Sequence, residues 1–317
     1  MMTDTHITHH VITTIIINIF DKLEEGEDEI IGKDEREQRK FMNIELFYVN
    51  INGLNENKTR NSDFLQDTQN ADIICLTETH LNVNNEQSLQ GNYSSFHTNV
   101  EKNNNRGRNI KGVSIFVKEI DYISQPDVEN LVKEKGNLQI LKLSSTYWNN
   151  LQDLFLIVCY VDNRDSNYKD RELYENIEQY MTQFKMKNII MIGDFNGRIG
   201  NETNYSNLGL SDRKSDDLMI NTMGRDLINF CNETSLIIAN GRLENNSEGR
   251  CTYYRYQNNE VRKSVIDYLL LSESMINHLT YFQIMGPAVY TDHSPMQIKF
   301  QIELKSEFTK QEQLSNR

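Results

Sequence analysis

The sequence contains few residues of several types that mark whole classes of protein. Its 317 residues include only 3 Pro, 4 Cys and 1 Trp. The cysteines form no CxxC pair, and Cys75 and Cys159 lie inside apolar runs, so the sequence predicts buried thiols and no zinc site. Unpaired thiols are typical of a reducing compartment, and we expect a nuclear or cytoplasmic protein.

Long apolar runs and an excess of basic residues are also missing. The longest apolar run, Val11–Phe20, has ten residues, about half of the roughly 20 that cross a bilayer. No basic residue precedes it, so it is a poor signal peptide, and we expect no membrane partner. The net charge of −13 argues against a chain held to nucleic acid by overall charge. A site lined by carboxylates would account for several of these charges.

Three segments of the chain differ in composition. Residues 1–42 combine the apolar run with an acidic stretch and have no steady period, so we expect a mobile acidic N-terminal extension. Residues 43–303 carry short β-branched apolar runs without a Pro/Gly/Ser linker between them, which indicates one domain. Residues 304–317 are expected to form a polar C-terminal tail.

The apolar runs of the central segment predict an α/β fold with many strands and few helices. Amphipathic spacing predicts helices over 170–187 and 221–234. Strands are predicted for the runs IELFYV, DIICLTE, GVSIFV, LQILKL, LFLIVCYV, NIIMIGDF, LIIAN, TYYRY, SVIDYLLL and MQIKFQIEL. This balance favours a four-layer sandwich, in which two packed mixed β-sheets are flanked by helices, over one doubly wound sheet.

Polar residues follow several predicted strands at the point where each strand ends. Asn50 ends the run in FYVNINGL, and Glu78 directly follows the run in IICLTETHL. In NIIMIGDFNGRIG, Asp194 and Asn196 lie two residues apart between glycines, which are expected to let the backbone turn sharply. Because a sheet can hold such strand ends rigidly over a shared site, we expect these side chains to meet.

Two further acidic residues belong with this set. Asp292 and His293, in TDHSP, place a carboxylate beside an imidazole just before the last predicted strand. Asp267 lies inside the apolar run SVIDYLLLS, where an ionised carboxylate needs a partner, and an imidazolium is a suitable one. Each of these residues alone is explained more readily by a turn, a loop cap or a surface pair, so the prediction depends on their joint occurrence.

The order NING, ETH, GDFN, IDY and TDH resembles the endonuclease/exonuclease/phosphatase superfamily, metal-dependent phosphoesterases built on two packed sheets. The resemblance covers about residues 43–303. Within the superfamily, NINGL, ETHL, GDFNGRIG, the NGR of IIANGR and VIDYLLLS are most similar to the endonuclease domains of non-LTR retrotransposons, which are themselves similar to apurinic endonucleases.

The resemblance implies a metal site and a set of catalytic residues. Glu78 would be the main Mg²⁺ ligand, helped by Asn50 and Asp292, with Mn²⁺ as an alternative ion. Mg²⁺ suits these residues because it prefers oxygen ligands and keeps several waters. The implied catalytic residues are Asp194 for the attacking water, Asn196 and Tyr160 for hydrogen bonds to the reacting phosphate, and His293, held by Asp267, for contact with the scissile phosphate.

Substrate contacts are less defined by the resemblance. The family usually has a proline-containing turn after the tyrosine, whereas here Val161, Asp162 and Asn163 follow Tyr160, and we predict that Asn163 still reaches the phosphate. Arg198 and Arg213 are predicted to track the DNA backbone, although solvated loop charges explain them equally well. Asn52 stands where apurinic enzymes carry an acid, which favours the retrotransposon type. Trp148 is expected to pack inside the protein.

The resemblance implies a Mg²⁺-dependent DNA endonuclease that nicks DNA and leaves a 3′ hydroxyl and a 5′ phosphate. We expect DNA as the partner and a monomeric protein. One alternative is another phosphoesterase on the same fold, a phosphoinositide phosphatase, sphingomyelinase or deadenylase. GDFNGRIG and SVIDYLLL stand where inositol phosphatases carry different segments, which argues against that alternative. The other alternative is an inactive domain that binds nucleic acid or a partner, which the complete set of polar residues argues against.

Overall fold

The computed structural model describes residues 39–82, 86–99, 111–119, 128–134, 136–146, 148–162, 169–202, 210–243, 245 and 248–305. The contact pattern separates Met1–Gln38 from Arg39–Arg317, and the second unit is described here. The predicted N-terminal extension lies outside the described residues up to Gln38, and the predicted tail lies outside them from residue 306 onward.

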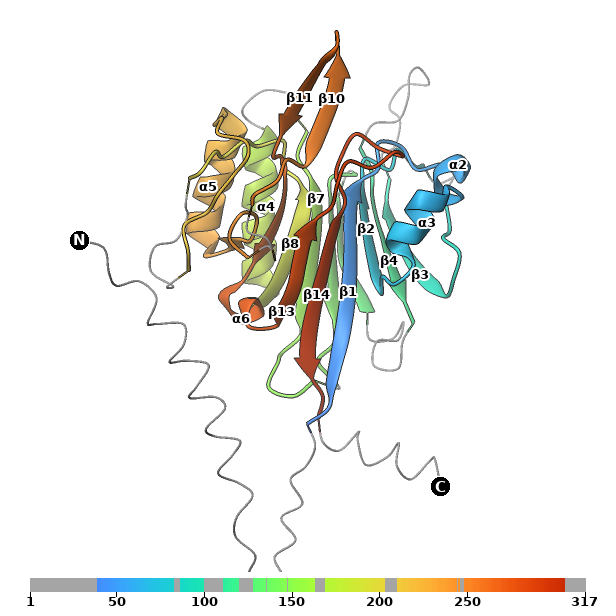
Figure 1. Cartoon of the computed structure of the whole chain (residues 1–317). Helices are drawn as coiled ribbons and strands as arrows, with labels where there is room; N and C mark the ends of the chain where they lie inside the picture. Colours follow the sequence, from blue (N-terminus) through green and yellow to red (C-terminus); the bar gives the residue numbers. More distant parts are fainter. Residues whose placement is uncertain are drawn as a thin grey trace, which may run out of the picture. The chain divides into compact units, whose positions relative to one another are not determined.

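Two six-stranded mixed sheets form the centre of the fold (Figure 1). The first sheet has the order β13 (Leu279–Ile284), β14 (Met296–Glu303), β1 (Phe41–Asn50), β2 (Ile73–Thr77), β4 (Val113–Lys118), β3 (Tyr93–Thr98). The second has the order β5 (Val128–Glu134), β6 (Leu138–Leu143), β7 (Leu154–Tyr160), β8 (Asn188–Asp194), β12 (Asp267–Leu271), β9 (Ile237–Ile238). A separate hairpin consists of β10 (Tyr253–Gln257) and β11 (Glu260–Ser264).

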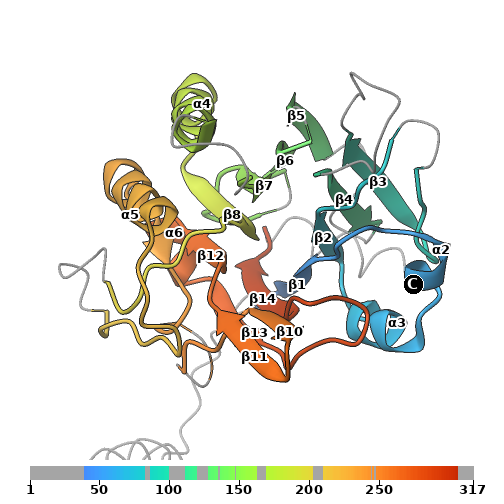
Figure 2. The ribbon, with the colours of Figure 1, turned by 90° about the horizontal axis from the view of Figure 1, so that it is seen from above.

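Helices cover the outer faces of both sheets, as the view along the strands shows (Figure 2). The short helices α2 (Glu56–Thr59) and α3 (Ser62–Thr68) lie beside the first sheet, and α4 (Lys169–Gln183) and α5 (Thr222–Thr234) lie against the second. A further short helix, α6 (Glu273–Ile276), follows β12. The predicted four-layer sandwich is therefore confirmed. Among the helices of the described ranges, none has the length and hydropathy to cross a membrane.

Strand β1 illustrates how the sequence produces these layers. Its first half alternates, with Met42 and Ile44 buried between the sheets and Asn43 exposed. Its second half is buried on both faces because Phe47 packs on Phe64 of α3, with ring centroids 6.4 Å apart. The strand is therefore amphipathic where solvent meets its outer face and apolar where a helix covers it.

The two predicted long helices are present with small shifts at their ends. Helix α5 begins one residue after Asn221, whose side chain accepts a hydrogen bond from the backbone N–H of Gly224, and it ends before Ser235 in the left-handed conformation. Helix α4 ends four residues before the predicted Lys187. The predicted apolar stripes of both helices pack against the outer face of the second sheet.

Four strands have no counterpart among the predicted runs: β3, β5, β11 and β13. Three of them, β3, β5 and β13, are edge strands of the two sheets, and β11 belongs to the exposed hairpin. Such strands carry charged and polar side chains because one edge or face meets solvent. Their sequences consequently lack the continuous apolar runs from which the other strands were predicted.

The topology brings the predicted site residues to one end of the sandwich. Strands β1 and β2 are parallel, as are β7 and β8, so the carboxyl ends of each pair lie together. Strand β12 runs antiparallel to β8 and places Asp267 directly opposite Asp194. Strand β14 runs antiparallel to β1, so the segment before it, with Asp292 and His293, reaches the same end as Asn50.

The turn after β8 was predicted to depend on the flanking glycines, but a different residue adopts its left-handed conformation. The left-handed residue of this turn is Asn196, with φ of 48°, rather than a flanking glycine. Gly193 is required by close approach instead, because a Cβ there would lie 2.1 Å from the backbone oxygen of Cys159 on β7. A side chain at position 193 would therefore push β7 and β8 apart.

Two arginines predicted to contact substrate, Arg198 and Arg213, hold loops in place in the structure. The guanidinium of Arg198 forms a two-pronged ion pair with the buried Asp217, with Nε–Oδ2 and Nη2–Oδ1 distances of 2.7 and 2.6 Å. Arg213 is 3% exposed and donates to the backbone oxygens of Gly200 and Glu202. The structure gives both residues structural partners, and their role as substrate contacts stays a prediction.

Replacing Gly193 by alanine is expected to lower the free energy of unfolding by about 1–3 kcal/mol, because the added methyl group overlaps the backbone of β7. Urea unfolding of the purified variant measures the change. Gly286→Ala serves as the control, since a Cβ there has no neighbour within 4 Å, and its effect should stay within about 0.5 kcal/mol. Equal stability of the two variants would contradict the close approach of β7 and β8.

Replacing Asp217 by asparagine is expected to lower the free energy of unfolding by about 1–3 kcal/mol at pH 7, because the ion pair with Arg198 is lost. Burial by itself raises the pKa of Asp217, but hydrogen bonds from Arg198 and from the amides of Met219 and Val265 outweigh it and hold the pKa below its usual value of 3.8.

Stability from a depressed carboxyl pKa is present above the unfolded pKa and is lost as the pH falls through the folded pKa. The difference in free energy of unfolding between wild type and Asp217→Asn should therefore become smaller below about pH 4. Denaturant titrations at several pH values measure it. The exposed neighbour Asp216 provides the control, since Asp216→Asn should change stability little at any pH. A pH-independent difference for Asp217→Asn would count against the ion pair.

Candidate active site

The centre of the site is the carboxylate of Asp267, which is completely buried at the start of β12. Its Oδ2 accepts a hydrogen bond from Nδ1 of His293 at 2.8 Å, and its Oδ1 accepts one from the hydroxyl of Tyr48 at 2.8 Å. Its backbone N–H donates to Oγ1 of Thr252. The predicted pairing of Asp267 with an imidazole is therefore present in the structure.

Asn50 connects two further carboxylates at the ends of neighbouring strands. Its Nδ2 donates to Oδ2 of Asp194 at 2.9 Å and lies 3.2 Å from Oε2 of Glu78. Its Oδ1 accepts the backbone N–H of Asn52 at 3.0 Å. The amide nitrogen of Asn50, rather than its oxygen, thus faces the carboxylates, so this geometry suits a residue that orients Glu78 and Asp194.

Tyr160 completes this part of the site from the end of β7. Tyr160 is 3% exposed, and its hydroxyl lies close enough to Glu78 and Asp194 to feel their charge. Burial raises the pKa of Tyr160 well above its usual value, and the negative charges of Glu78 and Asp194 raise it further. The hydroxyl therefore remains a hydrogen-bond donor beside the carboxylates.

The charge state of His293 follows from its surroundings. Burial by itself lowers the pKa of this imidazole, but the charge and hydrogen bond of Asp267, together with Asp194 and Asp292, outweigh burial and raise the pKa to about 9. Nε2 of His293 lies 3.9 Å from Oδ2 of Asp194, which is too far for a hydrogen bond. The imidazolium thus presents an Nε2–H donor at the centre of the site.

Burial acts on the pKa of Asp194 in the direction opposite to its effect on His293. Burial raises the pKa of its carboxyl, and the nearby charge of Asp267 raises it further, whereas His293 and the hydrogen bonds from Asn196 and Asn50 lower it. The net direction is upward, which gives this group the character of a base near neutral pH. The carboxyl group of Asp194 and the imidazole of His293 thus lie side by side, and the pKa of each is above its usual value.

Asp292 and Tyr253 lie on the side of the site nearest the hairpin. Asp292 Oδ1 is 3.3 Å from Nδ2 of Asn52, and its backbone oxygen accepts the N–H of Tyr254. The ring of Tyr253 lies against that of His293, with centroids 4.9 Å apart. Burial raises the pKa of the Tyr253 hydroxyl, as do the charges of Asp292, Asp194 and Glu78.

The balance of charge fits a divalent cation. Four carboxylates, those of Glu78, Asp194, Asp267 and Asp292, surround the single imidazole of His293. Across the described ranges, no lysine or arginine pairs with any of them. Carboxylate oxygens are the ligands that Mg²⁺ prefers, and Glu78 and Asp292 could supply them without breaking the Asp267–His293 bond.

A second group of potential ligands, Asp194, Asp267 and His293, has atoms within 4.8 Å of one another. In this group the Nδ1 of His293 already bonds to Asp267, whose other oxygen accepts the hydroxyl of Tyr48. A metal bound among all three would have to displace those buried hydrogen bonds. We therefore favour Glu78 and Asp292 as the ligands.

The remaining predicted residues differ in how far the structure describes them. Asn196 donates from Nδ2 to the backbone oxygen of Val161 at 2.7 Å, and its N–H bonds to Asp194, so it lies beside the cluster. Asn163 lies outside the described residues. Trp148 is 1% exposed, which confirms that it packs inside the protein. Cys75 and Cys159 are buried free thiols as predicted, and Cys231 and Cys251 are buried as well.

Sequence reasoning missed Tyr48 and the hairpin cations. Tyr48 stands within an apolar run, where a buried aromatic residue is the ordinary expectation.

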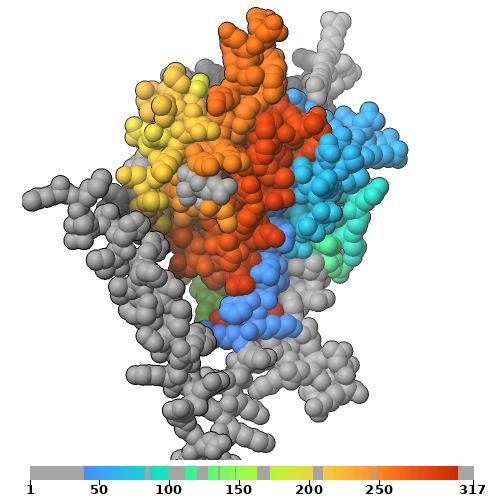
Figure 3. All heavy atoms as spheres, in the orientation of Figure 1, coloured from blue at the N-terminus to red at the C-terminus, as the bar shows by residue number. Residues whose placement is uncertain are grey.

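The hairpin projects beyond the sandwich at the site end (Figure 3), and its exposed cations are Arg255, Arg262 and Lys263. Arg255 shares a face with Tyr253, two residues before it, and Arg262 is its cross-strand partner. The hairpin therefore presents positive charge beside His293.

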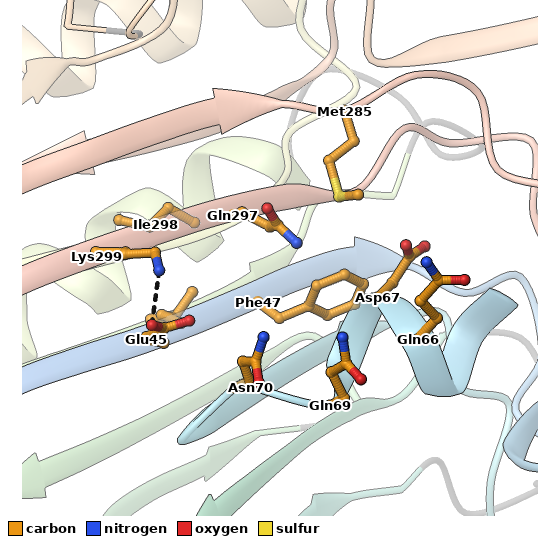
Figure 4. Close-up of a pocket in the computed structure, with 12 residues that line it drawn as sticks. Glu45, Phe47, Gln66, Asp67, Gln69, Asn70, Met285, Gln297, Ile298 and Lys299 are labelled. Atoms are coloured by element: carbon orange, nitrogen blue, oxygen red, sulfur yellow. Dashed lines mark hydrogen bonds and ion pairs between the residues drawn. The ribbon is translucent and has the colours of Figure 1, made fainter.

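Two pockets help to define the surroundings. A groove of about 490 Å³ beside Asp292 lies between the hairpin residues Tyr254 and Tyr256 and the exposed Val289. A polar pocket of about 250 Å³ lies between β1, α3 and β14 and contains Asp67 and the Glu45–Lys299 ion pair (Figure 4). The second pocket contains none of the predicted site residues.

Comparison with known proteins agrees with this architecture. Residues 154–297 match the family model described as endonuclease-reverse transcriptase. No curated protein matches the chain. Among solved structures, the endonuclease domain of TRAS1, a telomere-specific non-LTR retrotransposon, is 15% identical with a TM-score of 0.55, covering 81% of this chain and 98% of its own.

Two other solved structures have comparable similarity. The AP endonuclease LMAP from Leishmania major is 16% identical with a TM-score of 0.60, covering 89% of this chain and 94% of its own. The 3′ phosphatase NExo from Neisseria, bound to product DNA hairpin, is 16% identical with a TM-score of 0.56, covering 81% and 99%. At these identities the likeness concerns the fold. It shows that the chain has the fold of these enzymes, and the family match shows that residues 154–297 are similar to endonuclease-reverse transcriptase proteins.

Proposed function

We propose that this protein is a Mg²⁺-dependent DNA endonuclease of the retrotransposon type, with Mn²⁺ as an alternative ion. It hydrolyses one phosphodiester bond and leaves a 3′ hydroxyl and a 5′ phosphate. The observation that carries the proposal is the cluster at the strand ends, where Glu78, Asp194 and Asp292 lie around a charged His293 without a lysine or arginine partner in the described ranges. Such a cluster suits a cation and a phosphate together.

In this proposal Asp194 acts on the attacking water. Its raised carboxyl pKa makes it a better proton acceptor than an exposed aspartate, and the Nδ2 of Asn50 fixes the orientation of its Oδ2. The N–H of Asn196 fixes the other oxygen. Asp194 therefore receives the proton of the water that attacks the phosphorus in line.

His293 and Tyr160 bind the scissile phosphate. The Nε2–H of the His293 imidazolium donates to a non-bridging oxygen as charge accumulates there, and Asp267 holds the ring through Nδ1. The hydroxyl of Tyr160 donates to another phosphate oxygen, as does Asn196. Bound Mg²⁺, held by Glu78 and Asp292, would supply positive charge to the phosphate and to the leaving oxygen.

The choice of DNA rests on the hairpin and on the neighbours. Arg255, Arg262 and Lys263 place positive charge beside the site of an otherwise acidic chain, where a phosphate backbone can neutralise it. The matched solved structures include a retrotransposon endonuclease domain and an enzyme bound to a DNA hairpin. We further propose that the protein acts as a monomer in the nucleus or cytoplasm, a reducing setting that suits its four free thiols.

Purified wild-type protein is expected to nick supercoiled plasmid in Mg²⁺ and to be inactive in EDTA. Glu78→Gln and His293→Ala should each lower the rate by about 10²–10⁴-fold, because one removes a metal ligand and the other removes the phosphate donor. Agarose gel electrophoresis follows the conversion to open circles, and end labelling of the nick identifies the 3′ hydroxyl.

Asp67→Asn is the matched control for these variants, since Asp67 is a half-buried carboxylate in the pocket away from the site. It should nick at the wild-type rate. Folded wild-type protein that does not nick DNA would overturn the proposal. Phosphate release from phosphoinositides by that protein would then favour the other phosphoesterase class.

The double variant Arg255→Ala, Arg262→Ala is expected to bind DNA more weakly and with a shallower dependence on salt. Each lost phosphate contact lowers the slope of log K against log salt by about 0.9 for duplex DNA. Fluorescence anisotropy at several salt concentrations, in Ca²⁺ to prevent cleavage, measures both quantities. Lys185→Ala, Lys187→Ala is the control, because these exposed lysines precede β8, at the end of that strand opposite Asp194. An equal loss of DNA affinity in both double variants would exclude a specific role for the hairpin in DNA binding.

A further inference from the structure

Tyr48 is a completely buried tyrosine whose hydroxyl lies inside the site rather than in solvent. It belongs to β1 in the first sheet, and its hydroxyl donates to Oδ1 of Asp267, on β12 in the second sheet, at 2.8 Å. The same hydroxyl oxygen is 3.1 Å from Oγ1 of Thr77. The two oxygens of Asp267 are therefore divided between Tyr48 and His293.

The direction of these hydrogen bonds follows from proton counting. A tyrosine hydroxyl has one proton, and an ionised carboxylate only accepts, so the proton of Tyr48 goes to Asp267 and Thr77 must donate to Tyr48. Burial raises the pKa of Tyr48 well above its usual value, as do the charges of Asp267 and Asp194, so the proton stays on the hydroxyl. A continuous chain runs from Thr77 through Tyr48 to Asp267 and His293.

We propose that Tyr48 is a positioning residue, whose hydroxyl fixes the plane of the Asp267 carboxylate so that Oδ2 holds His293 with its Nε2 directed toward Asp194 and the scissile phosphate. The inference rests on the proposed function of this site. Tyr48 itself does not touch the phosphate, since its side chain is completely buried beneath the cluster. Its effect on catalysis passes through Asp267.

The alternative is that Tyr48 only fills the core between the sheets. A phenylalanine would fill almost the same volume, and its neighbours in that core are apolar. It would, however, leave Oδ1 of a completely buried carboxylate without its donor. The carboxylate could then rotate about its Cβ–Cγ bond and share its oxygens differently with His293, which a role in core packing alone would not produce.

The test is Tyr48→Phe, with nicking kinetics measured over a range of DNA concentrations. We expect kcat to fall about tenfold to 100-fold, the effect of losing one hydrogen bond to a charged group, while KM for DNA stays within about twofold. Tyr290→Phe is the matched control. It removes a hydroxyl that is likewise nearly buried and bonded to a carboxylate, that of Asp67, in the core under α3, and it should leave kcat unchanged.

A double-mutant cycle separates positioning from a general structural effect. If Tyr48 acts through Asp267, then Tyr48→Phe should cost less than about twofold in an Asp267→Asn background. An undiminished loss in that background would overturn the inference. An active wild type whose Tyr48→Phe variant keeps the full kcat would also overturn it, while leaving the proposed endonuclease intact.

A readout independent of activity completes the test. ¹⁵N-labelled protein gives the imidazole resonances of His293, assigned by their absence in His293→Ala, and Tyr48→Phe should shift them whereas Tyr290→Phe should not. If Tyr48→Phe shifts these resonances but the wild-type protein cleaves no DNA, the result supports the positioning role of Tyr48 and rejects the proposed endonuclease. If Tyr48→Phe does not fold, Thr77→Val decides, since it weakens the same chain from its far end. A several-fold lower kcat with an unchanged KM supports the inference, and an unchanged kcat overturns it.

Discussion

The structure depends on one buried carboxylate at the junction of two sheets. Asp267 belongs to the second sheet, but both hydrogen-bond partners of its side chain, Tyr48 and His293, come from the first sheet or the segment leading into it. A buried carboxylate without such donors would be costly, so these bonds are obligatory for the fold. They also fix how the two sheets align at the end where the chemistry takes place.

That constraint explains why the other polar groups lie where they do. Asp194 is the cross-strand partner of Asp267, and two carboxylates directly opposite each other repel. The repulsion and burial raise the pKa of Asp194, whereas the imidazolium of His293 and the amide of Asn50 stabilise its ionised form. The same arrangement that satisfies Asp267 thus creates a carboxyl group with the properties of a base beside a cationic donor.

The sequence predicted the residues of the site better than their contacts. Asn50, Glu78 and Asp194 were predictable because they follow apolar runs that can be read locally, and His293 because it stands beside Asp292 just before such a run. Tyr48 was not, since its partner lies 219 residues away and only the packing of the two sheets brings them together. The ion pair of Arg198 was not predictable for the same reason, because its partner Asp217 depends on how the following loop folds back. Edge strands such as β3 and β5 were missed because their solvent-facing residues are polar.

Two electrostatic features of opposite sign remain uncompensated within the described residues, and both lie at the same end of the sandwich. Around His293, carboxylates outnumber their positive partners, while on the hairpin Arg255 lies directly opposite Arg262. Like charges paired across strands destabilise a hairpin, and crowded carboxylates destabilise a buried site. In the proposed function, a cation at the carboxylates and a phosphate backbone at the hairpin would each lower one of these costs. Because a metal and a phosphate attract each other, binding of one would favour binding of the other in the proposed function, and both would bind at this end of the sandwich.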